Sequence, residues 1–192
     1  MKQIFTLMFT LTAAMGLAQM PSGLNVNDMA PGFSVADQNG KTVSLEKQLA
    51  KGPVVLLFYR GFWCPYCNKQ LKALEDSLGQ ITAKGATLIA VTPEKPESIT
   101  KTAAKTGATY PILFDDGLAI MNAYRVAFEM DTATVTRYRK YGIDMNENNG
   151  RNGANLPVPA VYIIKPGGKI GWRFFDVNYT KRPTVKEILE NL

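Results

Sequence analysis

The order of apolar and polar positions along the chain predicts an alternation of strands and helices. Residues 53–59 and residues 86–92 are nearly continuous apolar runs, which is typical of strands buried on both faces of a sheet. Between them, residues 65–80 place leucine and isoleucine at three- and four-residue spacing, while charged side chains occupy the other faces. This spacing predicts an amphipathic helix that follows the first buried strand.

Turn residues divide the rest of the chain into shorter elements. The pair Asn39-Gly40 is a strong hairpin signal, and Pro166-Gly167-Gly168 marks a second hairpin. Gly107 ends a polar helix, and Pro183 directly precedes a closing helix. The predicted elements are strands over 33–37, 41–45, 110–114, 161–165 and 169–175, and helices over 96–106, 115–127 and 184–192.

This order of elements predicts one α/β domain, with a central mixed β-sheet, helices on both faces and an N-terminal β-hairpin. Residues 130–156 interrupt the alternation and are interpreted as an insertion. Within it, residues 144–155 are rich in Asn and Gly, which predicts an exposed loop. Residues 137–141 form the densest basic and aromatic cluster of the chain. For this cluster we favour a solvated amphipathic helix, and the alternatives are a cap over the active site or a surface for an anionic partner.

The first residues have the pattern of a signal peptide. Lys2 is followed by a nearly uncharged, mostly apolar stretch over residues 4–17, which is too short to span a bilayer. Gly16 and Ala18 are small residues at the two positions that a signal peptidase reads, so we place the cleavage after Ala18. We therefore expect an exported domain over residues 19–192, periplasmic or secreted, with no stable membrane anchor. The alternative is an N-terminal helix that packs on the domain.

Composition removes several classes of function. The chain contains no histidine and two cysteines. Ser–His and Cys–His catalytic pairs and His-ligated metal or haem sites are therefore excluded. Two cysteines supply half of the ligands that a structural zinc ion needs, so we expect neither a metal nor another cofactor. The formal net charge is +6, but only residues 137–141 concentrate it, and we do not expect a nucleic-acid partner.

Both cysteines lie in the motif Trp63-Cys64-Pro65-Tyr66-Cys67, between the first buried strand and the amphipathic helix. Cysteines three positions apart at a helix start are one turn apart, close enough to form a disulfide bond. The unpaired N–H groups and the dipole of a helix N-terminus lower the pKa of a thiol placed there. We therefore expect Cys64 to be the exposed thiol with the low pKa, and Cys67 to resolve a mixed disulfide.

Neighbouring residues support this interpretation of the motif. Arg60 precedes the motif and Lys69 follows within the next turn, so both add positive charge. Pro65 is tolerated because the first N–H of a helix has no partner in any case. The alternative is an inert structural disulfide, which would make the protein a binding module that uses residues 130–156. A Cys64–Cys67 disulfide would close a loop with only two residues between the cysteines. Such a short loop constrains the unfolded chain little, so this alternative is less favoured.

Several segments carry a resemblance to a known family. Residues 26–33, 39–41 and 43–45 resemble the N-terminal hairpin of the alkyl hydroperoxide reductase C/thiol-specific antioxidant family, the peroxiredoxins. The motif with Trp63 and the two cysteines resembles that of thioredoxins and glutaredoxins. Val158-Pro159-Ala160 resembles the segment with the cis-proline that faces such a motif. The resemblance covers residues 25–192 and implies a thioredoxin-like fold, thiol redox chemistry and a supporting role for Pro159.

The chain also departs from the peroxiredoxin pattern. Peroxiredoxins carry Pro-x3-Thr-x2-Cys, in which the threonine and a distant arginine bind the peroxide. Aligned on that pattern, Cys67 stands at the peroxidatic position, Cys64 replaces the threonine and Arg60 replaces the proline. Pro159 stands where the distant arginine is expected. The partners that bind peroxide are therefore missing, while the thioredoxin elements are present.

The resemblance implies a thiol-dependent oxidoreductase that reduces peroxides or disulfides. The redox-active pair would close a Cys64–Cys67 disulfide, which an external thiol donor such as a thioredoxin-like protein would reduce again. One alternative is a thiol:disulfide interchange protein without peroxidase activity. The other is the exported binding module with a structural disulfide.

Overall fold

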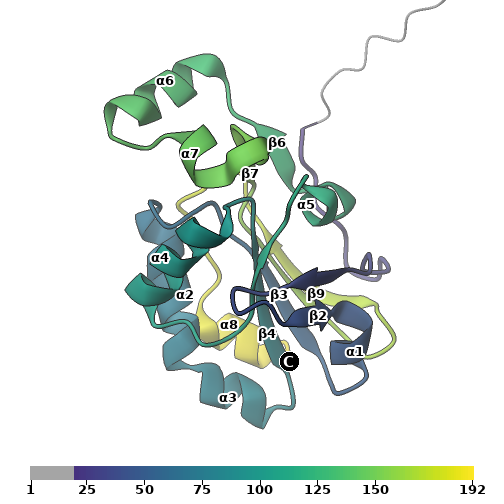
Figure 1. The fold of residues 1–192 in the computed structure, drawn as a ribbon. Helices are drawn as coiled ribbons and strands as arrows, with labels where there is room; N and C mark the ends of the chain where they lie inside the picture. The colour runs from purple at the N-terminus through teal and green to yellow at the C-terminus, as the bar shows by residue number, and fades with distance from the viewer. Residues whose placement is uncertain (1–19) are drawn as a thin grey trace, which may run out of the picture.

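The computed structural model describes residues 20–192, so the predicted signal peptide lies outside the described part of the chain. A five-stranded sheet with the strand order β5-β4-β3-β8-β9 forms its centre (Figure 1). Strand β3 pairs in parallel with β4 and antiparallel with β8, so the sheet is mixed, as predicted. The strands are β3 Val54–Phe58, β4 Thr87–Thr92, β5 Ile112–Phe114, β8 Ala160–Ile164 and β9 Ile170–Phe175.

Helices cover both faces of this sheet because β3 is apolar on both sides. Val55 and Leu57 belong to one core, which also includes residues from α2, α3, α4 and α8. Leu56 and Phe58 belong to the other core, which includes residues from α1 and α5. The helices are α1 Leu45–Leu49, α2 Pro65–Asp76, α3 Leu78–Ala83, α4 Pro96–Thr106, α5 Ala119–Ala123 and α8 Val185–Glu190. The fold class predicted from the sequence is confirmed.

The two predicted hairpins and the polar helix are also confirmed. Strands β1 Ser34–Ala36 and β2 Thr42–Ser44 pair antiparallel, as do β8 and β9. Helix α4 ends where Gly107 adopts a left-handed conformation with φ 75°. Helix α8 begins with Thr184 as its N-cap, and Thr184 and Glu187 form a capping box.

Two predicted helices are shorter in the structure. The helix expected over residues 65–80 is divided, because Ser77 leaves the helical conformation (φ −112°, ψ 7°) and separates α2 from α3. The helix expected over residues 115–127 is reduced to α5. Leu118 and Arg125 adopt left-handed conformations on either side of it. The Asp115 carboxylate accepts hydrogen bonds from the backbone N–H groups of residues 120 and 121 and holds the start of α5.

The predicted insertion is mostly helical, and this includes residues 144–155, for which we predicted an exposed loop. Strands β6 Ala127–Glu129 and β7 Asn155–Pro157 pair antiparallel at its base. Between them lie α6 Thr132–Lys140, α7 Met145–Asn149 and the 3-10 helix η1 Gly150–Asn152. Figure 1 shows α6 and α7 at the opposite end of the molecule from α3.

Buried asparagines explain why the loop prediction for residues 144–155 is wrong. Asn148, Asn149 and Asn152 are all buried, although their composition is typical of a loop. The Asn152 amide donates to the carbonyl oxygens of Pro93 (2.8 Å) and Asp115 (3.0 Å), and its oxygen accepts from the Gly117 N–H (2.8 Å). Asn152 therefore ties the end of the insertion to the loops that follow β4 and β5.

Within residues 20–192, no helix is long and apolar enough to cross a membrane.

We predict that Asn152→Ala lowers the free energy of unfolding by about 2–4 kcal/mol, because it removes two buried hydrogen bonds to the Pro93 and Asp115 carbonyl oxygens and a part-buried one from the Gly117 N–H. Urea denaturation followed by circular dichroism measures the change. Asn146→Ala is the matched control, since Asn146 is exposed on α7, and it should change stability by less than about 0.5 kcal/mol. Equal effects of the two substitutions would contradict the prediction.

Candidate active site

Helix α2 starts at the cysteine motif, as the sequence predicts. Cys64 is its N-cap residue, in an extended conformation, and its Sγ accepts a hydrogen bond from the Cys67 N–H at 3.4 Å. Pro65 occupies the first turn, where no N–H is needed. The two sulfur atoms therefore lie together at the N-terminus of a helix that packs on the central sheet.

The structure holds the reduced form of the pair. The Sγ atoms of Cys64 and Cys67 are 2.7 Å apart and both thiols are free. A disulfide bond would need a separation of about 2.05 Å. The Cys64–Cys67 disulfide is thus not formed here and stays a prediction for the oxidised state.

Both cysteines are buried, with exposed fractions of 1% for Cys64 and 0% for Cys67. The expectation that Cys64 is exposed is therefore wrong. Trp63 helps to explain the difference, because its ring packs both against the main core and against the small core of the insertion. From α6, the Tyr138 ring meets Trp63 edge-on with the centroids 5.4 Å apart. Cover over the motif comes from a segment far away in the sequence.

The order of the two thiol pKa values is the reverse of the prediction. Burial alone would raise the pKa of Cys67, but the Cys64 thiol and the Arg182 guanidinium outweigh burial and lower that pKa to about 6. The pKa of Cys64 is raised, first by its hydrogen bond with Cys67 and then by burial. Cys67 is therefore the thiol that ionises first. It is also the cysteine that stands at the peroxidatic position in the family pattern.

Arg182 is a site residue that the sequence analysis missed. It lies between β9 and α8, and its Nη2 donates to Cys67 Sγ at 3.3 Å. Its Nη1 donates to the carbonyl oxygens of Tyr179 and Lys181, both at 2.6 Å, which fixes the guanidinium in place. Lys69, for which the sequence predicts the same role, is exposed on α2 and is not among the main causes of either pKa shift.

Arg60 is held by aromatic rings instead of a carboxylate. It is only 4% exposed, and its guanidinium carbon lies 5.0 Å from the Trp63 ring centroid, 5.8 Å from that of Tyr138 and 4.4 Å from that of Tyr179. Its Nη2 donates to the Tyr138 hydroxyl at 2.7 Å. Its charge lowers the pKa of Cys64, as expected, although other effects dominate that pKa. Cation–π contacts stabilise the buried charge here.

The basic and aromatic cluster at residues 137–141 lies at the end of α6. The favoured prediction of a helix is confirmed over most of the cluster, and Arg137, Arg139 and Lys140 are exposed. Tyr138 is half-buried and contacts both Arg60 and Trp63. The cap, which was the alternative interpretation, is therefore also present, and it involves this one side chain of the cluster.

Glu94 is a second residue that the sequence analysis missed. It is fully buried after β4, and both carboxylate oxygens accept from the Phe62 N–H at 3.0 Å. Burial raises its pKa to about 8, and the nearby charge of Cys67 acts in the same direction. Gly61 permits this contact, because a Cβ there would lie 2.6 Å from Glu94 Oε1 and 2.5 Å from Trp63 Nε1.

The predicted cis-proline is wrong. No peptide bond in residues 20–192 is cis, so Pro159 follows a trans bond. The segment between β7 and β8 continues the pairing of β7 with β6, because the Val158 N–H donates to the Val126 carbonyl oxygen at 2.8 Å. Pro159 directly precedes Ala160, which pairs with Phe58, the last residue of β3. Pro159 therefore lies at the end of β8 that is next to the point where the chain leaves β3 and continues into the cysteine motif.

Comparison with known proteins agrees with this geometry. A model of the AhpC/TSA family matches residues 26–173. The chain belongs to the AhpC/TSA family. The matched residues include the N-terminal segments that suggested the family, the cysteine motif and strands β3, β4, β5 and β8.

Relatives of this AhpC/TSA chain have two kinds of name. It is 33% identical over 107 residues to the chloroplastic peroxiredoxin Q of Populus jackii, which covers 56% of this chain and 50% of that protein. It is 29% identical over 100 residues to the thiol-disulfide oxidoreductase ResA of Halalkalibacterium halodurans, which covers 52% of this chain and 56% of that protein. The chain thus matches about half the length of these relatives.

A solved structure supports the same fold. The crystal structure of peroxidoxin BcpB from Mycobacterium tuberculosis is similar with a TM-score of 0.67 and 18% identity, covering 86% of this chain and 94% of that one. At this identity the likeness concerns the fold alone.

We predict that Arg182→Gln raises the pH at which Cys67 becomes reactive by about 1–2 units, because removing a nearby cation disfavours the thiolate. Alkylation by iodoacetamide, followed against pH and assigned by mass spectrometry, measures this midpoint. Lys181→Gln is the matched control, as Lys181 is the exposed neighbour. An unchanged midpoint in Arg182→Gln would contradict the assigned role.

Proposed function

We propose that the protein is a thiol-dependent oxidoreductase of peroxiredoxin-like type, with Cys67 as the attacking thiolate and Cys64 as the resolving thiol. The observation that carries the proposal is the reduced sulfur pair at the start of α2, with Arg182 Nη2 3.3 Å from Cys67 Sγ. A thiolate is the reactive form of cysteine, and a cation beside it keeps that form populated near neutral pH.

The first step with a hydroperoxide is attack of the Cys67 thiolate on the terminal peroxide oxygen. A sulfur–oxygen bond forms, the O–O bond breaks, and the alkoxide leaves as an alcohol after taking a proton. Cys67 is oxidised to the sulfenic acid. The guanidinium of Arg182 remains beside the sulfur, so it also lies where the negative charge moves during the transfer.

The second step closes the disulfide. Cys64 attacks the Cys67 sulfur, the S–S bond forms, and the hydroxyl group leaves with the Cys64 proton as water. Once the thiolate of Cys67 has been consumed, the hydrogen bond that raised the pKa of Cys64 is lost. Arg60 then favours the Cys64 thiolate. An external dithiol reduces the disulfide and is itself oxidised.

Disulfide exchange is the second candidate, and the cysteine motif favours it. The Cys67 thiolate would attack a substrate disulfide, one substrate thiolate would leave, and Cys64 would release the other from the mixed disulfide. The name of the ResA relative supports this reading, and the name of the peroxiredoxin Q relative supports peroxide reduction. The missing threonine of the peroxiredoxin pattern weakens the peroxidase reading, whereas Arg182 supplies a cation at the attacking sulfur.

A protein thiol donor of the thioredoxin type is the proposed reductant. Tyr66, within the motif, and Tyr179 are both partly exposed, and their rings meet edge-on with centroids 6.1 Å apart. Exposed aromatic rings are typical of protein contact surfaces. They lie next to the buried sulfur pair, where a protein donor would have to dock.

We predict that Cys67→Ser loses both peroxide consumption and disulfide reduction. Cys64→Ser should consume about one equivalent of hydrogen peroxide and then stop, because no second thiol closes the cycle. Stopped-flow single-turnover measurements, with mass spectrometry of the sulfenic acid trapped by dimedone, report each step. Parallel assays with a disulfide substrate separate the two activities. If Cys64→Ser lost the first step and Cys67→Ser kept it, Cys64 would be the attacking residue, as the sequence analysis expected.

We also propose that residues 1–18 direct export and are removed, so that the protein acts in the periplasm or outside the cell. Expression of the full chain in a bacterium with a periplasm should give a periplasmic product that begins at Gln19. Ala18→Tyr should block cleavage, because a signal peptidase requires a small residue there. N-terminal sequencing of the fractionated product measures both outcomes, and a cytoplasmic product that begins at Met1 would contradict the proposal.

A further inference from the structure

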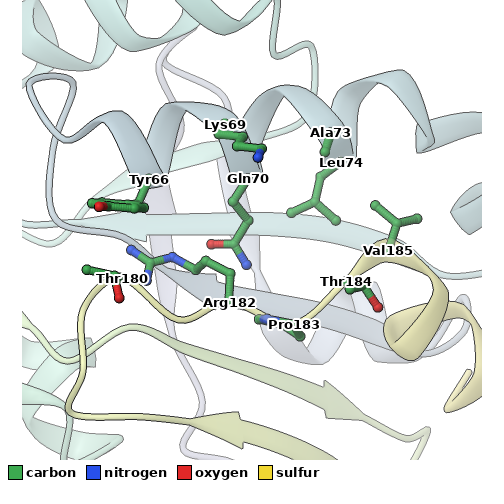
Figure 2. Close-up of a pocket in the computed structure, with 10 residues that line it drawn as sticks. All are labelled: Tyr66, Lys69, Gln70, Ala73, Leu74, Thr180, Arg182, Pro183, Thr184 and Val185. Atoms are coloured by element: carbon green, nitrogen blue, oxygen red, sulfur yellow. The ribbon is translucent and has the colours of Figure 1, made fainter.

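A cavity of about 500 Å³ lies between α2 and the segment over residues 180–185, and Arg182, which contacts Cys67 Sγ, is one of its lining residues. The proposed reaction does not use this cavity. Its walls are largely apolar, and Ala73, Leu74, Pro183 and Val185 contribute to them. Figure 2 shows Gln70 reaching from α2 toward Arg182 on the opposite wall. A volume of this size is typical of sites for small organic ligands.

Two buried nitrogen atoms on these walls lack a hydrogen-bond partner. Among the residues that the structure describes, neither Gln70 Nε2 nor Arg182 Nε donates to any acceptor. Gln70 is 7% exposed, and an unpaired buried N–H group costs about 1–3 kcal/mol. The terminal torsion of glutamine is soft, so the Gln70 amide can turn toward a ligand in the cavity.

The charges around the cavity have one sign. Lys69 and Arg182 line it, and none of its lining residues is acidic. Neither lysine nor arginine here forms an ion pair within residues 20–192. The unpaired donors of Gln70 and Arg182, together with the positive charges of Lys69 and Arg182, favour a ligand with negatively charged oxygen atoms, and the apolar walls favour a hydrocarbon body.

We propose that this cavity binds an organic carboxylate with an apolar body, whose oxygen atoms accept hydrogen bonds from Gln70 and Arg182. Lys69 adds attraction at the rim. The apolar part of the ligand packs against Leu74 and Val185. The site is separate from the position at which the substrate meets Cys67, because Arg182 lies between the cavity and the sulfur.

Occupation of the site should slow the reaction of Cys67. Nη2 of Arg182 contacts Cys67 Sγ, so a bound carboxylate and the thiolate share one cation and repel each other. This effect rests on the proposed function, whereas binding does not. Cys64 and Arg182 are the side chains that lower the pKa of Cys67. Cys67 in turn raises the pKa of Cys64, Glu94 and Tyr59.

Isothermal titration calorimetry of the reduced protein with octanoate tests the binding, and octanol is the neutral control. We expect saturable binding of octanoate and at least about tenfold weaker binding of octanol, because hydrogen bonds to a charged group are the stronger ones. Gln70→Leu, which keeps the volume, should weaken octanoate about tenfold. Ala73→Trp should abolish binding by filling the cavity, and Lys72→Gln, on the same helix outside the cavity, should leave it unchanged.

Three results would overturn the assignment. They are the absence of saturable octanoate binding, equal binding of octanol, and octanoate binding that survives both Gln70→Leu and Ala73→Trp. Circular dichroism spectra of each variant verify that it is folded. The alkylation rate of Cys67 with and without octanoate tests the coupling, and a rate that saturating octanoate leaves unchanged would overturn the coupling alone. If the wild-type protein reduced neither peroxides nor disulfides, the proposed function would be refuted and the binding result would stand.

Discussion

A negative charge on a buried sulfur atom has to be compensated by the protein, and the rest of the site follows from this constraint. The chain has no histidine, so no imidazolium can serve. Compensation for Cys67 comes from the Cys64 thiol and the Arg182 guanidinium. The first is available because α2 begins at Cys64, and the second because the chain returns past α2 before it enters α8. Both therefore depend on where α2 begins and on what packs beside its first turn.

The two arginines of the site have different surroundings and act on different thiols: the charge of Arg182 lowers the pKa of Cys67, and that of Arg60 lowers the pKa of Cys64. Arg182 is fixed by backbone carbonyl oxygens and keeps one edge on Cys67. Arg60 is enclosed by aromatic rings and has its hydrogen bond with Tyr138, a residue of the insertion. A carboxylate partner would neutralise either cation and weaken its effect on a sulfur atom. The aromatic enclosure stabilises Arg60 without adding a negative charge, and α6 contributes the Tyr138 ring to it.

The sequence was a good guide wherever one local pattern decides the structure. The strands at residues 53–59 and 86–92, the end of α4 at Gly107 and the start of α2 at the motif all follow from neighbouring residues. Arg182 and Glu94 could not be found in this way, because Arg182 lies 115 positions from Cys67 and only the tertiary fold brings them together. The sequence places Asn152 in a loop because asparagine is common in loops and turns. In the structure its side-chain amide is buried and hydrogen-bonded to backbone groups. Cys64 was expected to be exposed because its cover comes from a distant helix.

The ionisation order of the buried acids reverses the order of the free groups. The pKa of a free carboxyl group is well below that of a free thiol. In this site the pKa of Cys67 is lowered to about 6, and burial raises the pKa of Glu94 to about 8. Arg182 contacts the sulfur, while the Glu94 carboxylate receives the Phe62 N–H and feels the like charge of Cys67. Burial therefore favours the neutral carboxyl group at Glu94, while Arg182 favours the thiolate at Cys67. A charged Glu94 would oppose the Cys67 thiolate, so the burial that keeps this carboxyl group neutral acts together with the Arg182 guanidinium to favour the reactive form of the sulfur.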